Sequence, residues 1–449
     1  NQKSMRDVPL DTITQYACED ADITFQLKEV TDRLVKDKGA DKLLQEVELP
    51  LIPILCKMEC EGVNLDIPFL QQYAEDLEKD LVVLRSNIFK MAGQEFNLDS
   101  PKQMGQILFV KMAIPYSGKK TKTGQFSTNE ETLSALNDKH EIISEILKYR
   151  ELTKLKSTYV DALPRLVNRH TGRIHTTFNQ TIAATGRLSS LNPNLQNIPI
   201  RTERGRAIRK AFIPRNKDYL LMAADYSQIE LRIIAAISQD KGMLEAFHND
   251  EDIHSATAAK VFGISIQEVD REMRRKAKAV NFGIIYGQTA FGLSQSLKIP
   301  RTEAREIIDN YFKQYPGIKA YMTKTIEFAR KHGYVETLLK RRRYLRNINS
   351  NNNTVRSHAE RNAINSPIQG SAADMIKIAM IKVDAAMKKE NFKSKMILQI
   401  HDELVFDVHK PELEKLQTLV IREMKNALPQ IGVPIKVEVG VGDNWLEAH

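Results

Sequence analysis

Four side chains that recur at every fourth position constrain this chain most. They are Arg274, Lys278, Phe282 and Tyr286. Residues four apart lie on one slowly drifting helix face, so the spacing predicts a helix over 274–287 with two cations, an apolar ring and a phenol on one side. Fixed cations suit a polyphosphate, and the rings suit a sugar and a base. The segment therefore indicates a nucleoside triphosphate site, although an ordinary amphipathic helix with a solvated basic edge has the same spacing.

The bulk composition limits the class of protein. The 449 residues suffice for several packed units, and the 42% hydrophobic content supplies their cores without an apolar run long enough to span a bilayer. We therefore expect a multidomain protein with no membrane partner. The 66 Lys and Arg against 57 Asp and Glu give a net charge of +9, which favours a polyanionic partner but is weak evidence alone.

The cysteines and the start of the chain add two expectations. Cys18, Cys56 and Cys60 are too few for a disulfide framework and point to a reducing compartment. Cys56 and Cys60 lie one helical turn apart without nearby His or Cys partners for a metal, so we expect buried core thiols. The chain starts at Asn1 without an initiator Met or a signal-like segment, so we expect that residues upstream are missing.

The sequence pattern changes character along the chain. Residues 1–40 predict a short helical segment, too small to hold a core of its own. The pattern is then mostly helical over 46–169, with long amphipathic stretches at 69–91 and 130–167. Residues 170–211 are instead rich in Asn, Gln, Thr and Arg, which predicts loops whose donors could reach phosphates or minor-groove base edges. Plain polar loops have a similar composition.

A lysine-rich loop interrupts the helical part. Lys119, Lys120 and Lys122 lie between two glycines in 116–125. The loop is either a solvated tip or a flexible arm that contacts phosphates, and both interpretations fit its composition.

Two aspartates far apart in the sequence are each expected at a strand end. Asp225 follows the apolar run 219–224 and precedes a helix that is predicted to begin near Gln228. Asp402 lies at the tip of a predicted hairpin, between two apolar runs. Folding could bring both carboxylates together around two Mg²⁺ ions, ~3.5–4 Å apart, which would stabilise the attacking and departing oxygens of a phosphoryl transfer. Each aspartate alone also fits a common structural role, as a helix N-cap or a solvated turn.

Taken in order, the segments 225–232, 274–287 and 401–403 closely resemble the three polymerase motifs of family A DNA polymerases. The resemblance extends from about residue 16 to the C-terminus. It implies an α+β multidomain fold with a right-hand polymerase architecture, in which the palm holds an antiparallel sheet and helices form the fingers and the thumb. The implied divisions are 1–45 as the C-terminal remnant of a 3′→5′ exonuclease-like domain, 46–169 as the thumb with the start of the palm, 170–233 as the first part of the palm, 234–360 as the fingers, and 361–449 as the second part of the palm.

The resemblance implies a DNA-directed DNA polymerase that adds deoxynucleotides to a primer 3′ end by two-metal-ion phosphoryl transfer, with release of pyrophosphate, in replication and repair. It implies two Mg²⁺ ions, for which Mn²⁺ can substitute, at Asp225, Asp402 and the backbone carbonyl of Tyr226. Glu403 and Lys278 complete the implied catalytic set, and Lys278 is placed to protonate the departing pyrophosphate. The implied partners are primer–template DNA and deoxynucleoside triphosphates, and we expect a monomer in the bacterial cytoplasm, associated with the nucleoid.

The same resemblance assigns nucleotide contacts to seven side chains. They are Arg274, Lys278, Phe282, Tyr286, His254, Glu230 and Gln228. His254 resembles an additional phosphate ligand, Phe282 would stack near the sugar, and Tyr286 would lie beside the templating position. Glu230 matches the residue that closes the sugar pocket against a ribose 2′-hydroxyl, which favours deoxynucleotides.

DNA contacts are implied for a second set of residues. They are Arg187, Asn197, Arg361, Asn365, Gln369, His401, Lys119, Lys120 and Lys122. Arg361, Asn365 and Gln369 would share one helical face if the helix continues through Pro367, and a polar surface helix has the same spacing. At the other end of the chain, Tyr16 and an acidic residue four positions later resemble the last motif of a proofreading domain. Its partner carboxylates have no counterpart, so we do not expect this chain alone to proofread.

Three other functions share part of this pattern. A metal-dependent phosphohydrolase built on His401 and Asp402 predicts a helical context and further histidine ligands, whereas the flanks here predict strands. A single-subunit RNA polymerase would share the palm chemistry, but Glu230 argues against acceptance of ribose. A non-enzymatic nucleic-acid-binding protein explains the charge but not the joint occurrence of paired acids and a cationic helix.

Overall fold

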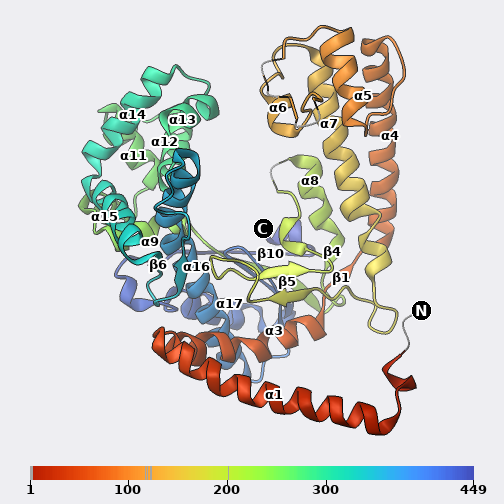
Figure 1. The fold of residues 1–449 in the computed structure, drawn as a ribbon, viewed down its shortest axis with the longest axis vertical. Helices are drawn as coiled ribbons and strands as arrows, with labels where there is room; N and C mark the ends of the chain where they lie inside the picture. Colours follow the sequence, from red (N-terminus) through yellow and green to blue (C-terminus); the bar gives the residue numbers. More distant parts are fainter. Residues whose placement is uncertain (1–3, 117, 119, 122–123, 201) are drawn as a thin grey trace.

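The structure is a computed structural model that describes residues 4–116, 118, 120–121, 124–200 and 202–449. It is mostly helical, with small antiparallel sheets (Figure 1). One helical lobe rises on each side of a central sheet, and the long helix α1 runs beneath it. Within the described residues, no helix combines the length and the apolar composition that a bilayer span requires.

The central sheet has four antiparallel strands in the order β10-β5-β9-β8. Their bounds are Tyr219–Tyr226 for β5, Lys395–Ile400 for β8, Glu403–His409 for β9 and Val437–Gly442 for β10. Strand β9 is buried except at His409, and the middle of β5 (221–224) is buried as well, in agreement with the apolar runs of both strands. Helix α9 (Ile229–Ser238) follows β5, and a two-residue turn joins β8 to β9, so the predicted strand–helix junction and the predicted hairpin are both confirmed.

In the described part of the chain, three two-stranded sheets accompany the central one. They pair β1 (Asn64–Leu65) with β4 (Phe212–Ile213), β2 (Thr177–Asn179) with β3 (Ser189–Leu191), and β6 (Tyr334–Glu336) with β7 (Arg342–Tyr344). Several helices pack around the sheets. They are α3 (Leu49–Glu61), α17 (Leu413–Lys425) and α18 (Trp445–Ala448), whereas α2 (Asp41–Leu43) and α8 (Glu203–Ala207) contact neighbouring helical segments. Helices α17 and α18 contact the central strands and cover their apolar side chains.

Within its described residues, the lobe that follows α3 holds four α-helices. They are α4 (Ile67–Ala92), α5 (Pro101–Gln106), α6 (Glu130–Ser134) and α7 (Glu141–Leu155). Helix α4 confirms the stretch predicted at 69–91, and Asp66 caps it by accepting a hydrogen bond from the backbone of Phe69. The single stretch predicted at 130–167 is wrong, because it is divided between α6, α7 and two shorter helical segments. His140 caps α7 after a turn, and Pro164 lies in a 3₁₀ segment that ends the series.

The opposite lobe consists of six helices that follow α9. They are α10 (Lys241–His248), α11 (Ile253–Phe262), α12 (Arg271–Ile285), α13 (Ala290–Leu297), α14 (Arg301–Gln314) and α15 (Pro316–His332). Helix α11 packs against α12, and α14 packs against both α11 and α13. The predicted helix over 274–287 is confirmed as far as Ile285, and Tyr286 lies directly after its last residue.

The longest helix, α16 (Asn353–Lys389), connects this lobe with the sheet. It continues through Pro367, so the unbroken helix on which the face of Arg361, Asn365 and Gln369 depends is confirmed. Many of its small residues are buried, and it packs against α3, α9, α15 and α17. The helix is therefore buried on most sides by these neighbours, and its polar residues lie on one remaining face.

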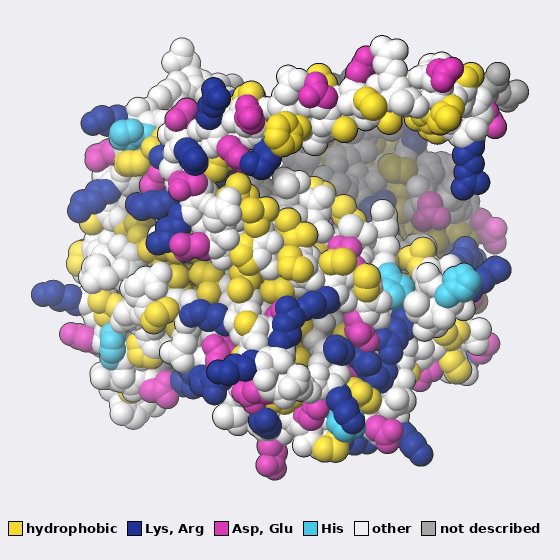
Figure 2. All heavy atoms as spheres, turned by 90° about the horizontal axis from the view of Figure 1, so that it is seen from below, with side chains coloured by type: hydrophobic (Ala, Val, Ile, Leu, Met, Phe, Trp, Pro, Cys, Tyr) yellow, Lys and Arg dark blue, Asp and Glu magenta, His cyan; other side chains and the backbone are white. Residues whose placement is uncertain are grey.

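The N-terminal helix α1 (Leu10–Asp37) buries none of its side chains. Its large exposed hydrophobic residues are Leu10, Tyr16, Ile23, Phe25, Leu27, Val30 and Leu34. In the view from below, hydrophobic side chains lie among charged ones on this side of the molecule (Figure 2). The helix holds no core of its own, as its length predicted.

The prediction of buried cysteines is wrong. Cys56 and Cys60 are both exposed on α3. The buried side of α3 is formed by Leu51, Ile54, Leu55 and Met58, at the spacing of one helix face. Because Cys56 and Cys60 fall outside this spacing and lie one helical turn apart, they share the solvent-facing side.

Candidate active site

Antiparallel pairing of β5 with β9 brings the two predicted aspartates to one end of the sheet. Asp225 is in register with Glu403, and the backbone N–H of Tyr226 donates a hydrogen bond to the carbonyl oxygen of Asp402 at 3.2 Å. Burial raises the pKa of Asp402 to about 6. Burial and the nearby charge of Asp402 raise the pKa of Asp225 to about 7. Two desolvated carboxylates that repel each other are stabilised by a shared cation.

The donor chemistry of this pair fits a hard divalent cation. Asp225, Asp402 and the Tyr226 carbonyl offer only oxygen, which Mg²⁺ prefers. In the part of the chain that the structure describes, no three His, Cys, Asp or Glu side chains converge as a complete metal cage. Mg²⁺ usually completes its shell with water and substrate phosphates rather than with protein groups alone, so the residues present fit the ion.

Glu403 is engaged by residues that the sequence analysis missed. The indole N–H of Trp445 donates to its carboxylate at 2.9 Å, and Nη1 of Arg209 lies 3.9 Å from it. The Arg209 guanidinium also stacks 4.0 Å from the centre of the Trp445 ring and is only 3% exposed. No sequence signal marked Arg209, because it lies in a short 3₁₀ segment that resembles an ordinary polar stretch. The structure thus adds a buried cation behind the acidic pair.

Helix α12 presents the two predicted phosphate-binding cations in different states. Both Arg274 and Lys278 are exposed. Arg274 donates two hydrogen bonds to the carboxylate of Asp252, at 3.0 and 2.8 Å. Hydrogen bonds from Arg274 and Ser255 lower the pKa of Asp252 to about 2, although burial opposes the shift. Lys278 forms no hydrogen bond or ion pair with the described residues, so its ammonium is available to a ligand.

The aromatic side chains lie further along the same face. The rings of Phe282 and Tyr286 are nearly parallel, with centroids 6.4 Å apart. The His254 ring lies 5.8 Å from that of Phe282, and the residue is 2% exposed. The structure therefore brings His254, which lies on α11, next to the predicted face of α12.

Glu230 joins two other predicted residues, Tyr286 and Arg187. It is buried on α9 and accepts hydrogen bonds from the hydroxyl of Tyr286 at 2.6 Å and from Arg187 at 2.7 Å. Burial and the charge of Glu230 raise the pKa of Tyr286, so its hydroxyl stays protonated. The ion pair places Arg187, a predicted DNA contact, beside the predicted sugar pocket. Gln228 precedes α9 in a left-handed conformation, with φ of 55°.

The predicted polar face of α16 adjoins the end of α12. Arg361 is exposed, and a Cβ built on Gly287 would lie 2.6 Å from its Cγ, so only glycine permits this close approach. Asn365 keeps its side-chain oxygen buried without a hydrogen-bond partner among the described residues. Gln369 is half-buried one turn further on.

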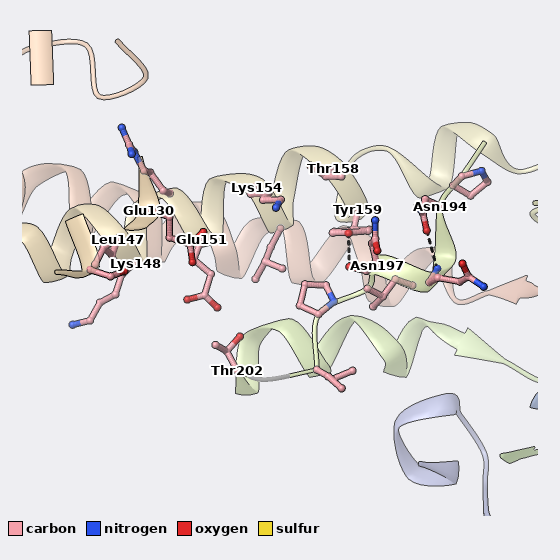
Figure 3. A pocket seen from close by; sticks show the side chains of 18 of the residues that line it. Glu130, Leu147, Lys148, Glu151, Lys154, Thr158, Tyr159, Asn194, Asn197 and Thr202 are labelled. Carbon is pink, nitrogen blue, oxygen red and sulfur yellow. Dashed lines mark hydrogen bonds between the residues drawn. The ribbon is translucent and has the colours of Figure 1, made fainter. Parts of the chain in front are cut away.

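A groove of about 1070 Å³ separates α7 from the loop that follows β3 (Figure 3). Two predicted DNA contacts, Asn197 and His401, line it. The hydroxyl of Tyr159 donates to the backbone carbonyl of Asn197 at 2.6 Å and ties the two sides together. Asn194, from the donor-rich segment predicted over 170–211, also lines the groove, together with polar residues that no prediction named, which are Lys148, Glu151, Lys154 and Thr158. The spacing of Lys148, Glu151 and Lys154 along one face of α7 was the signal that could have identified these three residues.

The lysine-rich loop is described only in part. Lys120 is exposed, with its ammonium 4.8 Å from the centre of the Phe126 ring. Lys119 and Lys122 lie outside the described residues, so their predicted DNA contacts stay predictions.

Comparison with known proteins gives consistent matches over most of the chain. A sequence model described as DNA polymerase family A matches residues 67–447. DNA polymerase I of Geobacillus stearothermophilus is 47% identical over 97% of the chain and 50% of its own length. DNA polymerase I of Pseudomonas aeruginosa is 46% identical over 100% of the chain and 49% of its own length. The chain thus spans about half the length of the curated relatives it matches.

A solved structure extends the similarity to the fold. It is the POL domain of Pol1 from M. smegmatis in complex with DNA primer-template and dNTP. It is 45% identical, with a TM-score of 0.89 over 94% of the chain and 74% of its own chain. This agreement confirms the predicted α+β fold class with right-hand architecture.

Proposed function

Because the chain belongs to DNA polymerase family A, we propose that it is a DNA-directed DNA polymerase that extends a primer 3′ end with deoxynucleotides in replication and repair. The observation that carries the proposal is the pairing of β5 with β9, which gathers Asp225 and Asp402 at one end of the sheet. Both carboxylates are desolvated there, as a site for divalent cations requires.

In this proposal two Mg²⁺ ions, for which Mn²⁺ can substitute, are held by Asp225, Asp402 and the carbonyl of Tyr226. When bound, the ions lower the pKa of the primer 3′-hydroxyl and neutralise charge on the departing pyrophosphate. Glu403 contributes negative charge next to Asp225, while Trp445 restrains its carboxylate.

The cationic face of α12 binds the triphosphate in this proposal. Lys278, which has no ion-pair partner among the described residues, donates a proton to pyrophosphate as it leaves. Arg274 exchanges the carboxylate of Asp252 for phosphate oxygens, which preserves a bidentate charge-assisted contact. His254 supplies a further phosphate contact, and Phe282 stacks near the sugar.

The sugar pocket is closed by Glu230, with Gln228 beside it. Tyr286 and Arg187 hold the Glu230 carboxylate in place. A ribose 2′-hydroxyl would clash with the Glu230 side chain, which these hydrogen bonds keep from moving away, so ribonucleotides are excluded. Tyr286 borders the templating position.

Primer–template DNA occupies the groove along α7 and the polar face of α16. The M. smegmatis structure, which is named as a complex with DNA primer-template and dNTP, supports this partner. The proposed DNA contacts are Arg187, Asn197, Arg361, Asn365, Gln369, His401, Lys119, Lys120 and Lys122. Lys148 and Lys154 join them, because both line the groove and carry the charge that phosphates require.

The division of the chain stays a proposal as well. Residues 1–45 form the exonuclease-like remnant, 46–169 the thumb, 234–360 the fingers, and 170–233 with 361–449 the palm. We further propose a monomer that acts in the bacterial cytoplasm near the nucleoid.

A primer-extension assay of Asp402→Ala tests the proposal. We expect extension to fall by about 10³-fold or more, with binding to primer–template DNA retained, because the variant removes a metal ligand but no DNA contact. Asp218→Asn is the matched control, since Asp218 is exposed next to the opposite end of β5. Extension by Asp402→Ala at the control rate would contradict the metal role.

The same assay separates the other functions. A purely DNA-binding protein would show no extension in the unsubstituted chain. A phosphohydrolase built on His401 and Asp402 finds no support, because His401 lies in the turn between two strands and no cluster of further metal-binding side chains accompanies it among the described residues.

A further inference from the structure

We propose that Asn281 is a positioning residue that fixes His254 in the tautomer with the proton on Nε2, so that the ring donates a hydrogen bond to a nucleotide phosphate. The inference rests on the proposed function and deepens it by assigning the proton of one phosphate contact. Asn281 lies on α12 between Lys278 and Phe282, but it faces the interior of the lobe and is fully buried.

The amide of Asn281 lies against one nitrogen of the His254 ring. Its Nδ2 is 3.1 Å from Nδ1 of His254 and 3.1 Å from Oγ1 of Thr257. An amide nitrogen only donates hydrogen bonds, so Nδ1 of His254 must be the bare acceptor. A neutral imidazole carries one proton, which therefore lies on Nε2.

Two further side chains hold the amide in this orientation. Oγ1 of Thr257 is 3.2 Å from Oδ1 of Asn281 and 3.2 Å from the hydroxyl of Tyr315. Burial raises the pKa of Tyr315 to about 12, so that hydroxyl keeps its proton. Tyr315 can donate to Thr257, which donates to Asn281, and the amide then donates to His254. All four residues are buried, so water does not compete for these bonds.

The ring must be neutral for the tautomer to matter. Burial and the positive charges of Arg274 and Lys278 lower the pKa of His254 to about 4, although Asp252 opposes the shift. His254 is also the second residue of α11, where the positive end of the helix dipole disfavours an imidazolium.

A neutral ring attracts an anion only through its N–H. The Nε2 proton would meet a phosphate oxygen favourably, whereas a bare Nε2 would repel it. Among the described residues Nε2 has no hydrogen-bond partner, and the ring adjoins Phe282 on the ligand face of α12. The neutral His254 ring cannot attract a phosphate through a positive charge. By fixing the proton on Nε2, Asn281 lets the ring donate a hydrogen bond to the phosphate instead.

Nitrogen NMR of the ligand-free chain, labelled with ¹⁵N-histidine, tests the assignment directly. The signals that disappear in His254→Gln identify the ring, and we expect the Nε2–H pattern. Asn281→Asp keeps the size of the side chain but presents an acceptor to Nδ1, so we expect a proton on Nδ1 and a raised pKa of the ring. An Nδ1–H pattern in the unsubstituted chain, or no change in Asn281→Asp, would overturn the inference.

Steady-state incorporation of one nucleotide gives the second test. We expect Asn281→Ala to raise KM for the deoxynucleotide by about ten-fold and to change kcat less, since one charge-assisted contact is lost. In a His254→Gln background, Asn281→Ala should add nothing, because its effect passes through the ring. An equal further rise in that background would show that Asn281 acts through packing and would overturn the inference.

The two tests separate this inference from the proposed function. Normal primer extension with unchanged KM in His254→Gln would reject the phosphate contact, and with it the role of Asn281, while the polymerase activity stands. Absence of extension in the unsubstituted chain would reject the polymerase function itself, and the NMR result would still decide the tautomer.

Discussion

The acidic end of the sheet and the cationic face of α12 carry opposite charges, and they differ in their exposure to solvent. Asp225 and Asp402 are desolvated at the ends of buried strands, which raises both pKa values. Arg274 and Lys278 are exposed on a helix, one paired with a carboxylate and the other solvated. The desolvated acids therefore cost stability while no opposite charge compensates them, whereas the exposed cations carry little such cost.

On the helix side the largest effect is expected at Lys278, although it is smaller than the loss expected for Asp402→Ala at the sheet. Lys278→Ala should slow nucleotide incorporation by about 10²-fold and weaken duplex binding much less, because the proposed role of Lys278 lies in the transition state. Lys276→Ala is the matched control, since Lys276 lies on the same helix but pairs with Glu303 at 3.3 Å. Rapid single-turnover kinetics measures the rate. A larger loss of DNA binding than of rate would move Lys278 from catalysis to docking.

The junction of the two regions comes next. Glu230→Ala should lower the discrimination against ribonucleotides by about ten- to hundred-fold, because it opens the sugar pocket and releases Tyr286 and Arg187. Glu230→Gln keeps the shape and should retain most of the selectivity. Competing single-nucleotide incorporation measures the ratio. Unchanged selectivity in Glu230→Ala would place the sugar elsewhere.

Burial of Asp225 and its repulsion by Asp402 predict that the stability of the fold depends on pH. The folded pKa of Asp225, about 7, lies above the value of 3.8 for a free carboxyl, so the folded state binds more protons between these values. The free energy of unfolding should therefore fall as pH rises through this window. In a chelator at about pH 8, Asp225→Asn should be more stable than the unsubstituted chain by about 1–3 kcal/mol.

Urea denaturation measures this difference, which should shrink at about pH 5, where Asp225 is mostly protonated. Added Mg²⁺ should stabilise the unsubstituted chain more than the variant. Equal stability of both chains at the two pH values would show that the acids are not desolvated.

The smallest effect concerns the paired cation. Asp252→Asn removes the charge that holds Arg274 but keeps the N-cap of α11, because asparagine also caps well. We expect KM for the deoxynucleotide to fall by about two- to three-fold, since Arg274 no longer has to leave a carboxylate. A titration with a non-reacting nucleotide analogue measures the same change in binding. A raised KM would indicate that Asp252 positions Arg274 for the ligand.

Local periodicity predicted the elements that hold the site. The apolar run before Asp225 and the hairpin around Asp402 are strands in the structure, and the four-residue spacing from Arg274 is a helix. The helix also continues through Pro367, as the shared face of Arg361, Asn365 and Gln369 requires. These features depend on residues within a few positions of one another, which is why a single sequence indicates them.

Contacts between distant segments could not be predicted in this way. The ion pair of Glu230 with Arg187, the stack of Arg209 on Trp445 and the hydrogen bond from Asn281 to His254 each join separate elements. No spacing in the sequence marks such a pair. The prediction that Cys56 and Cys60 are buried was wrong for the same reason, because packing against other elements decides which side of α3 is buried.

By itself the sequence determined the order of the motifs, the residue types that can bind a triphosphate, and membership of a family whose pattern spans most of the chain. Only the tertiary structure decided which acids share an end of the sheet, which cation is already paired, and which ring nitrogen of His254 faces the amide of Asn281. The reason is physical: secondary structure follows local side-chain patterns, whereas desolvation, charge pairing and proton position depend on neighbours that folding brings together from remote parts of the chain.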